Sequence, residues 1–130
     1  MLVLRKKLKR PRRQGPEATL QKAVLEYLSH ALPTTAFFSF FPLGGGGLFH
    51  GMRMRQLGAR KGFPDLIVLY DGCAYCIELK SNKGVLQDSQ RDCHAALQDA
   101  RVPVQVCRSV ADVQRFLRDD CGLYLRAVAQ

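Results

Sequence analysis

The sequence predicts a single α/β domain in which a mixed β-sheet is flanked by helices. The runs 66–70 and 73–77 are apolar on both faces, as in strands that are covered on both sides. They are joined by Asp71-Gly72, a strong signal for a two-residue hairpin turn. Helical and extended patterns alternate along the rest of the chain. The whole chain has 130 residues, a length that suits one hydrophobic core rather than two.

The first helix is expected to begin at Pro16, because proline suits the first helical position, and to end before Pro33. Its apolar stripe comprises Leu20, Val24, Leu25 and Leu28. Residues 37–41 (FFSFF) predict a short, fully buried strand bounded by Pro42. Four phenylalanines around one serine favour a place in the core over stacking on bases.

A second long helix is expected from Leu86 to Ala100. Its expected buried residues are Leu86, Cys93, Ala96, Leu97 and Ala100. Residues 102–107 predict another buried strand. Ser109 and Asp112 resemble the start of a capping box that opens a last helix through Phe116 and Leu117. Residues 121–130 are apolar, and an edge strand and a subunit contact both remain open for them.

The hairpin predicts a cluster of charges at one end of the sheet. Pairing Tyr70 with Cys73 and continuing outward sets Asp65 opposite Glu78 on one face, with Cβ atoms roughly 5 Å apart. Lys80 points to the same face, since side chains alternate along a strand. Opposed carboxylates destabilise a sheet unless a cation offsets them, and Mg²⁺ favours oxygen ligands. The plain alternative is a solvated hairpin end, which the apolar faces of both strands disfavour.

Composition limits the class of protein. The formal net charge of +9 favours a polyanionic partner, nucleic acid first and an anionic membrane surface second. No apolar run approaches the ~20 residues that span a bilayer, and the basic N-terminus lacks the apolar core of a signal peptide. Five cysteines, an odd number, are typical of reduced thiols. We therefore expect an intracellular protein.

The basic run 5–13, interrupted only by Leu8 and Pro11, predicts a disordered tail over residues 1–15, ahead of a domain over 16–130. Three interpretations stay open for it: an arm that grasps DNA, a solvated tail without a specific role, and a nuclear localisation signal.

Pro64-Asp65 followed by Glu78-x-Lys80 resembles the PD-(D/E)xK nuclease signature. Further residues are similar to the VRR-NUC branch of that superfamily over about residues 16–118; they are Glu17-x-x-x-Gln21, Gly62 before Pro64-Asp65, and Gln90. The resemblance implies a restriction-endonuclease-like core.

The resemblance also implies functional roles. Asp65, Glu78 and the Leu79 carbonyl would hold Mg²⁺ or Mn²⁺, and Glu17 would reach the metal through water with support from Gln21. Lys80 would position the attacking water, and Gln90 would contact the site from its helix. The implied activity is hydrolysis of DNA phosphodiester bonds. Stand-alone members resembling this chain act as homodimers on branched DNA such as Holliday junctions.

Cationic residues around the motif are predicted to hold DNA phosphates; they are Arg53, Arg55, Arg60, Lys61 and Lys83. The glycines at 44–47 suit either a loop that closes over DNA or a plain linker. Cys73-x-x-Cys76 is not expected to bind zinc, because the two thiols point to opposite faces of a strand. His94, one turn after Gln90, is expected at the surface or boundary.

Two other functions stay open. One is a non-catalytic DNA-binding subunit that recruits a helicase or another DNA-processing partner. The other is a nuclease of similar fold that cleaves RNA, which no RNA-binding module in the sequence supports.

Overall fold

The computed structural model describes residues 15–41, 52–53 and 56–128. Helix α1 (Pro16–Ala31) precedes strands β1 (Phe37–Phe40), β2 (Leu66–Tyr70) and β3 (Cys73–Leu79). Helix α3 (Asp88–Asp99), strand β4 (Val104–Cys107), helix α4 (Val110–Arg115) and the π-helix η1 (Phe116–Asp120) follow. The four strands form one sheet in the order β1-β2-β3-β4, antiparallel except for the parallel β3–β4 pair. This is the predicted mixed sheet.

The β2–β3 hairpin has the predicted turn and register. Asp71 and Gly72 both have positive φ, 50° and 74°, as a tight hairpin turn between twisted strands requires. The paired residues run from Tyr70–Cys73 to Leu66–Ile77. The ladder ends there, so Asp65 lies one residue beyond the last backbone pair rather than within the ladder.

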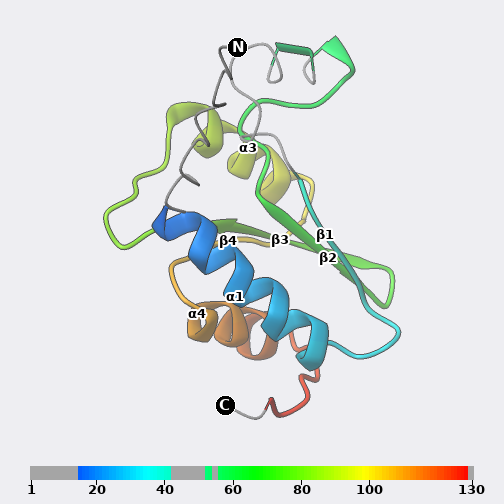
Figure 1. The fold of residues 1–130 in the computed structure, drawn as a ribbon. Coiled ribbons are helices and arrows are strands. Elements are labelled where there is room, and N and C mark those ends of the chain that lie inside the picture. Colours follow the sequence, from blue (N-terminus) through cyan, green and yellow to red (C-terminus); the bar gives the residue numbers. More distant parts are fainter. Residues whose placement is uncertain (1–14, 42–51, 54–55, 129–130) are drawn as a thin grey trace, which may run out of the picture.

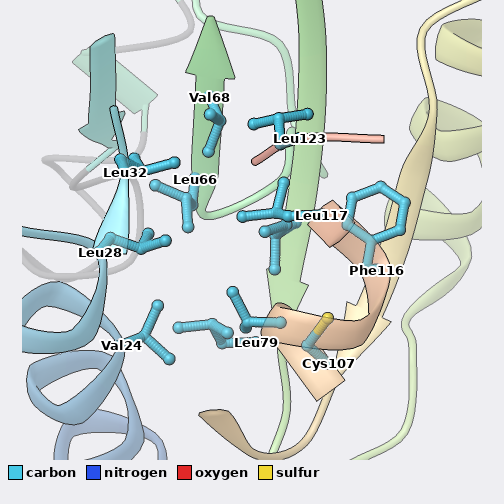
Figure 2. Packing of buried hydrophobic residues seen from close by; sticks show 12 residues of the cluster. Val24, Leu28, Leu32, Leu66, Val68, Leu79, Cys107, Phe116, Leu117 and Leu123 are labelled. Carbon is cyan, nitrogen blue, oxygen red and sulfur yellow. The ribbon is translucent and has the colours of Figure 1, made fainter. Parts of the chain in front are cut away.

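Helices cover both faces of the sheet. Figure 1 shows α3 on one side and α1 with α4 on the opposite side. The main core lies on the α1 side, where β2, β3 and β4 meet α1, α4 and η1 (Figure 2). Its buried residues are Val24, Leu28, Leu32, Leu66, Val68, Ile77, Leu79, Cys107, Val113, Phe116, Leu117 and Leu123. Because strand side chains alternate, Cys76 and Glu78 point to the α3 side.

The outer strands are less buried than predicted. Residues 37–41 were expected to be fully buried, but β1 is an edge strand whose Phe37 is 64% exposed. Phe38 and Phe40 still pack on the core. β4 forms the other edge and starts at Val104 rather than Val102, and its Gln105 is exposed. Among the described residues, each of these two strands has a neighbouring strand on one side alone, which leaves its side chains less covered.

Two helical predictions are also corrected. Leu25 is 45% exposed, because it lies about 100° around α1 from the buried Val24. α3 begins at Asp88 rather than Leu86, since Gln87 is its N-cap. Of the apolar residues predicted to be buried there, only Cys93 is; Leu86, Ala96 and Leu97 are half-buried and Ala100 is exposed.

The segment 121–128 packs against the end of α1 and contains no strand. Leu123 is buried in the core. The Arg126 amide donates to the Ala31 carbonyl at 2.8 Å, and its guanidinium donates to the Leu32 carbonyl at 3.3 Å. These donors satisfy carbonyls that the end of a helix leaves free, so the segment belongs to the domain.

The basic tail, the glycines at 44–47 and Arg55 lie outside the described residues. In the part of the chain that is described, no helix has the length and apolar character needed to cross a membrane.

Candidate active site

Asp65 lies at the end of β2 and is held by main-chain groups on both sides. Its carbonyl accepts from the Phe41 amide at 2.8 Å, and its Oδ2 accepts from the Leu79 amide at 2.8 Å. The side chain therefore continues the pairing with β3 where the backbone ladder has stopped. Burial raises the pKa of Asp65, the Leu79 amide opposes that rise, and the charge of Glu17 adds to it.

Glu78 is the most deeply buried acidic side chain in the described part of the chain, with 2% of its surface exposed. Its Oε1 accepts from Gln90 Nε2 at 2.7 Å and lies 4.0 Å from Lys80 Nζ. Burial, followed by repulsion from Asp65, raises the pKa of Glu78 to about 8. The two carboxylates thus act on each other, as the predicted register requires.

Gln90 reaches Glu78 from the first turn of α3. Its Oε1 accepts from the Gln87 amide at 2.9 Å, which leaves Nε2 to donate to Glu78. Gly62 lets the chain before Pro64-Asp65 pass directly against this turn. A Cβ at residue 62 would lie 2.1 Å from the Ser89 carbonyl oxygen, and its φ is +82°. The Gly62-x-Pro64-Asp65 motif therefore joins the acidic pair to α3.

Gly84 marks the point where α1 reaches the site. A Cβ on Gly84 would lie 3.3 Å from each of Glu17 Oε1, Lys80 Cδ and Ser81 Oγ. Glu17, although exposed in the first turn of α1, is thus brought beside the buried Lys80. Gln21 is exposed one turn further along α1.

Arg108 makes contacts near the site that its place in the sequence does not indicate. Its Nη1 donates to the carbonyls of Ser81 and Gly84 at 2.5 and 2.8 Å. The end of β4 thereby holds the loop that follows Lys80. An arginine directly after a strand gives no sequence signal for this contact.

His94 contradicts the expectation of a surface or boundary residue. Only 8% of its surface is exposed, and its Nε2 lies 3.7 Å from Glu78 Oε2. Burial and then the charge of Lys80 lower its pKa. Its spacing from Gln90 placed it on the same face of the helix, but only packing shows that this face meets Glu78.

The cationic residues predicted to contact DNA precede the Gly62-x-Pro64-Asp65 motif in the sequence, except for Lys83, which follows Lys80. Arg53, Arg60, Lys61 and Lys83 are exposed. Arg60 is near enough to α3 for its charge to act on the pKa of Cys93. All five cysteines are free thiols, including the exposed Cys73 and the buried Cys76.

The donors fit a hard divalent cation, although the described residues contain no group of three or more His, Cys, Asp or Glu side chains able to hold a metal. Asp65 and Glu78 offer oxygen atoms, the kind of ligand that Mg²⁺ prefers. Burial raises the pKa of both carboxyl groups, and repulsion from Asp65 raises the pKa of Glu78 further. A cation between the two would therefore stabilise their charged forms.

A family model and a solved structure are similar to this chain. The sequence model of the VRR-NUC domain matches residues 49–111. A solved structure titled "VRR_NUC domain protein" is similar over 86% of this chain and 93% of that chain, with a TM-score of 0.63 and 15% identity. Curated protein sequences yield no match.

The segment that matches the VRR-NUC model contains Asp65, Glu78, Lys80 and Gln90 of the candidate site. This match agrees with the VRR-NUC resemblance of the motifs, and the solved structure supports the fold.

Proposed function

We propose that this protein is a divalent-metal-dependent nuclease that hydrolyses phosphodiester bonds in DNA at the Asp65–Glu78 site. One observation carries the proposal. The half-buried Asp65 and the buried Glu78 meet at the end of the sheet beside a buried lysine, although burial favours the neutral form of each carboxylate. Such an arrangement is costly for the fold alone and is expected where charge is needed for chemistry.

Asp65, Glu78 and the Leu79 carbonyl would hold Mg²⁺ or Mn²⁺, with Glu17 contributing through a water molecule and Gln21 in support. When bound, the ion lowers the pKa of a water and neutralises charge on the phosphate. The Leu79 amide fixes one oxygen of Asp65, and Gln90 fixes one oxygen of Glu78. Both acidic groups are therefore oriented before a ligand arrives.

Lys80 is suited to the reacting water and the phosphate. Its Nζ lies 4.0 Å from Glu78 Oε1, which keeps the cation beside the acidic pair. It would orient the attacking water and stabilise the negative charge that develops on the phosphate oxygens. Arg53, Arg55, Arg60, Lys61 and Lys83 would bind the DNA backbone around the cut.

Branched DNA such as a Holliday junction is the proposed substrate, and a homodimer the proposed active form. The resemblance to family members that act as homodimers on such DNA supports both. A two-fold symmetric dimer would present two equivalent sites for two symmetric cuts.

The test incubates a four-way junction and a linear duplex of the same sequence with the protein, in Mg²⁺ or Mn²⁺ and in EDTA. Asp65→Asn and Glu78→Gln keep the volume of each side chain but remove its charge. We expect cleavage only with metal, and a loss of about 10²–10³-fold or more in each variant. The matched control is Glu26→Gln, which neutralises an exposed carboxylate on α1 and should cleave normally.

If the linear duplex is cleaved as fast as the junction, the proposed selectivity for junctions is wrong but the proposed nuclease activity stands. Sedimentation as a monomer would contradict the proposed dimer. Binding without cleavage by the wild-type protein would favour the non-catalytic subunit. Full activity in either acidic-pair variant would refute the proposed site.

A further inference from the structure

Two buried polar atoms face each other across the interface between α3 and β3. Glu78 Oε2 and His94 Nε2 are 3.7 Å apart, and neither has a hydrogen-bond partner among the described residues. Hydrogen bonds of this type span about 2.7–3.2 Å, so a small side-chain rotation would join the two atoms. Because a buried polar atom without a partner is costly, such a pair is expected to close.

The same helix already holds the other oxygen of Glu78. Gln90 Nε2 donates to Oε1 at 2.7 Å, and His94 follows Gln90 by one helical turn. Residues four apart lie on one face of a helix. α3 therefore presents two side-chain nitrogens to the two oxygens of a single carboxylate.

We propose that His94 is a positioning residue, whose Nε2–H donates to Glu78 Oε2 and fixes the carboxylate together with Gln90. With both oxygens held, the plane of the carboxylate is set, and its remaining lone pairs are directed before a metal ion binds. Partners that orient metal ligands in this way commonly determine metal affinity. The inference rests on the proposed function in one respect, namely that Glu78 is a metal ligand.

Three variants distinguish the effect of losing the His94 N–H donor from the effect of disturbing the packing of α3. His94→Phe keeps a ring of similar size without a donor. His94→Gln restores an N–H at a similar reach. Cys93→Ala alters the packing of the neighbouring buried position of α3 and serves as the control.

Mn²⁺ affinity is measured by titration calorimetry on the full chain without DNA. His94→Phe should weaken Mn²⁺ binding by about 10–100-fold, while the other two stay within about threefold of wild type.

A second measurement does not need metal. In EDTA, thermal unfolding of the wild type, His94→Phe, Glu78→Met and the double variant forms a double-mutant cycle. We expect His94→Phe to lower the unfolding midpoint less when Glu78 is already Met, because the acceptor is then gone.

Unchanged Mn²⁺ affinity in His94→Phe would overturn the inference, as would an equal loss in His94→Gln or Cys93→Ala. A wild-type protein that binds no Mn²⁺ would instead refute the proposed metal site. The cycle would then decide whether His94 holds Glu78, and independent effects of the two substitutions would overturn that contact.

Discussion

The amide of Gln90 shows how one side chain can connect local structure to a site. Its oxygen accepts from the Gln87 amide at the start of α3, so its nitrogen is left to face Glu78. A glutamate at residue 90 can serve the same cap, because a carboxylate also accepts. It cannot donate to Glu78, and it would place a like charge beside a buried one.

Gln90→Glu is therefore expected to retain the helix but to lose function. Metal-dependent cleavage should fall by about 10–100-fold, as for other residues that orient a metal ligand. Cleavage rates over a range of Mn²⁺ concentrations check this. Gln98→Glu, an exposed position of the same helix, is the matched control. Equal losses in both variants would assign the effect to added negative charge in general.

Glu78 predicts how the metal-free protein responds to pH. Burial and Asp65 raise its pKa to about 8 in the folded state, from 4.5. Between these values the folded state binds more protons than the unfolded state, so stability falls as pH rises. The contribution is complete below the unfolded pKa and is lost as pH rises through the folded one.

In EDTA, the free energy of unfolding of the wild type should thus decrease between about pH 5 and pH 8 relative to Glu78→Gln. The variant removes the titrating group but keeps its shape. A single group changes stability by at most about 1.4 kcal/mol per pH unit. Urea unfolding at several pH values measures the difference. A difference that stays constant with pH would show that Glu78 does not titrate in this range.

The elements around the site are joined at Gly62. This residue lets the segment before β2 lie against the first turn of α3, where a Cβ would overlap the Ser89 carbonyl. Asp65 directly precedes β2 and Gln90 lies in the first turn of α3, so the contact sets the distance between two parts of the site. A larger residue must move one of these elements.

Gly62→Ala should lower the unfolding temperature by about 10 °C, since strain at positive φ costs ~1–3 kcal/mol and the displacement of α3 adds to it. Gly72→Ala is the matched control, because Gly72 has a similar φ of +74° with open space around it. Calorimetry should find the smaller loss in Gly72→Ala. If both variants lower the unfolding temperature equally, backbone strain rather than the contact with α3 is the reason that residue 62 is a glycine.

For the molecule as a whole, the net charge of +9 would attract the DNA proposed as its substrate. If residues 5–13 contact phosphates, their deletion should weaken binding to all duplexes alike. It should also flatten the dependence of affinity on salt, because each phosphate contact contributes about 0.9 to the slope of log K against log salt. Affinities for a junction and a duplex at several salt concentrations check both effects.

Preference for the junction should survive the deletion, because a folded dimer would recognise the shape of the DNA. An unchanged salt slope would show that the tail makes no phosphate contacts. A lost preference would assign junction recognition to the tail.

The features that depend on local geometry follow from the amino-acid sequence alone. The Asp71-Gly72 turn and the two-residue period of strands set the hairpin register, which brings Asp65 and Glu78 together at one end of the sheet. Helical spacing likewise placed Gln90 and His94 on one face of a helix, although the start of α3 at Asp88 and its Gln87 cap became clear only in the structure.

Which surfaces meet, in contrast, depends on how the whole domain packs. It left Phe37 exposed on an edge strand, buried His94 against Glu78, and brought Arg108 to the loop after Lys80. Each outcome depends on contacts between segments that are distant in the sequence. Periodicity shows which residues share a face, but the partner of that face is selected by the packing of the whole domain.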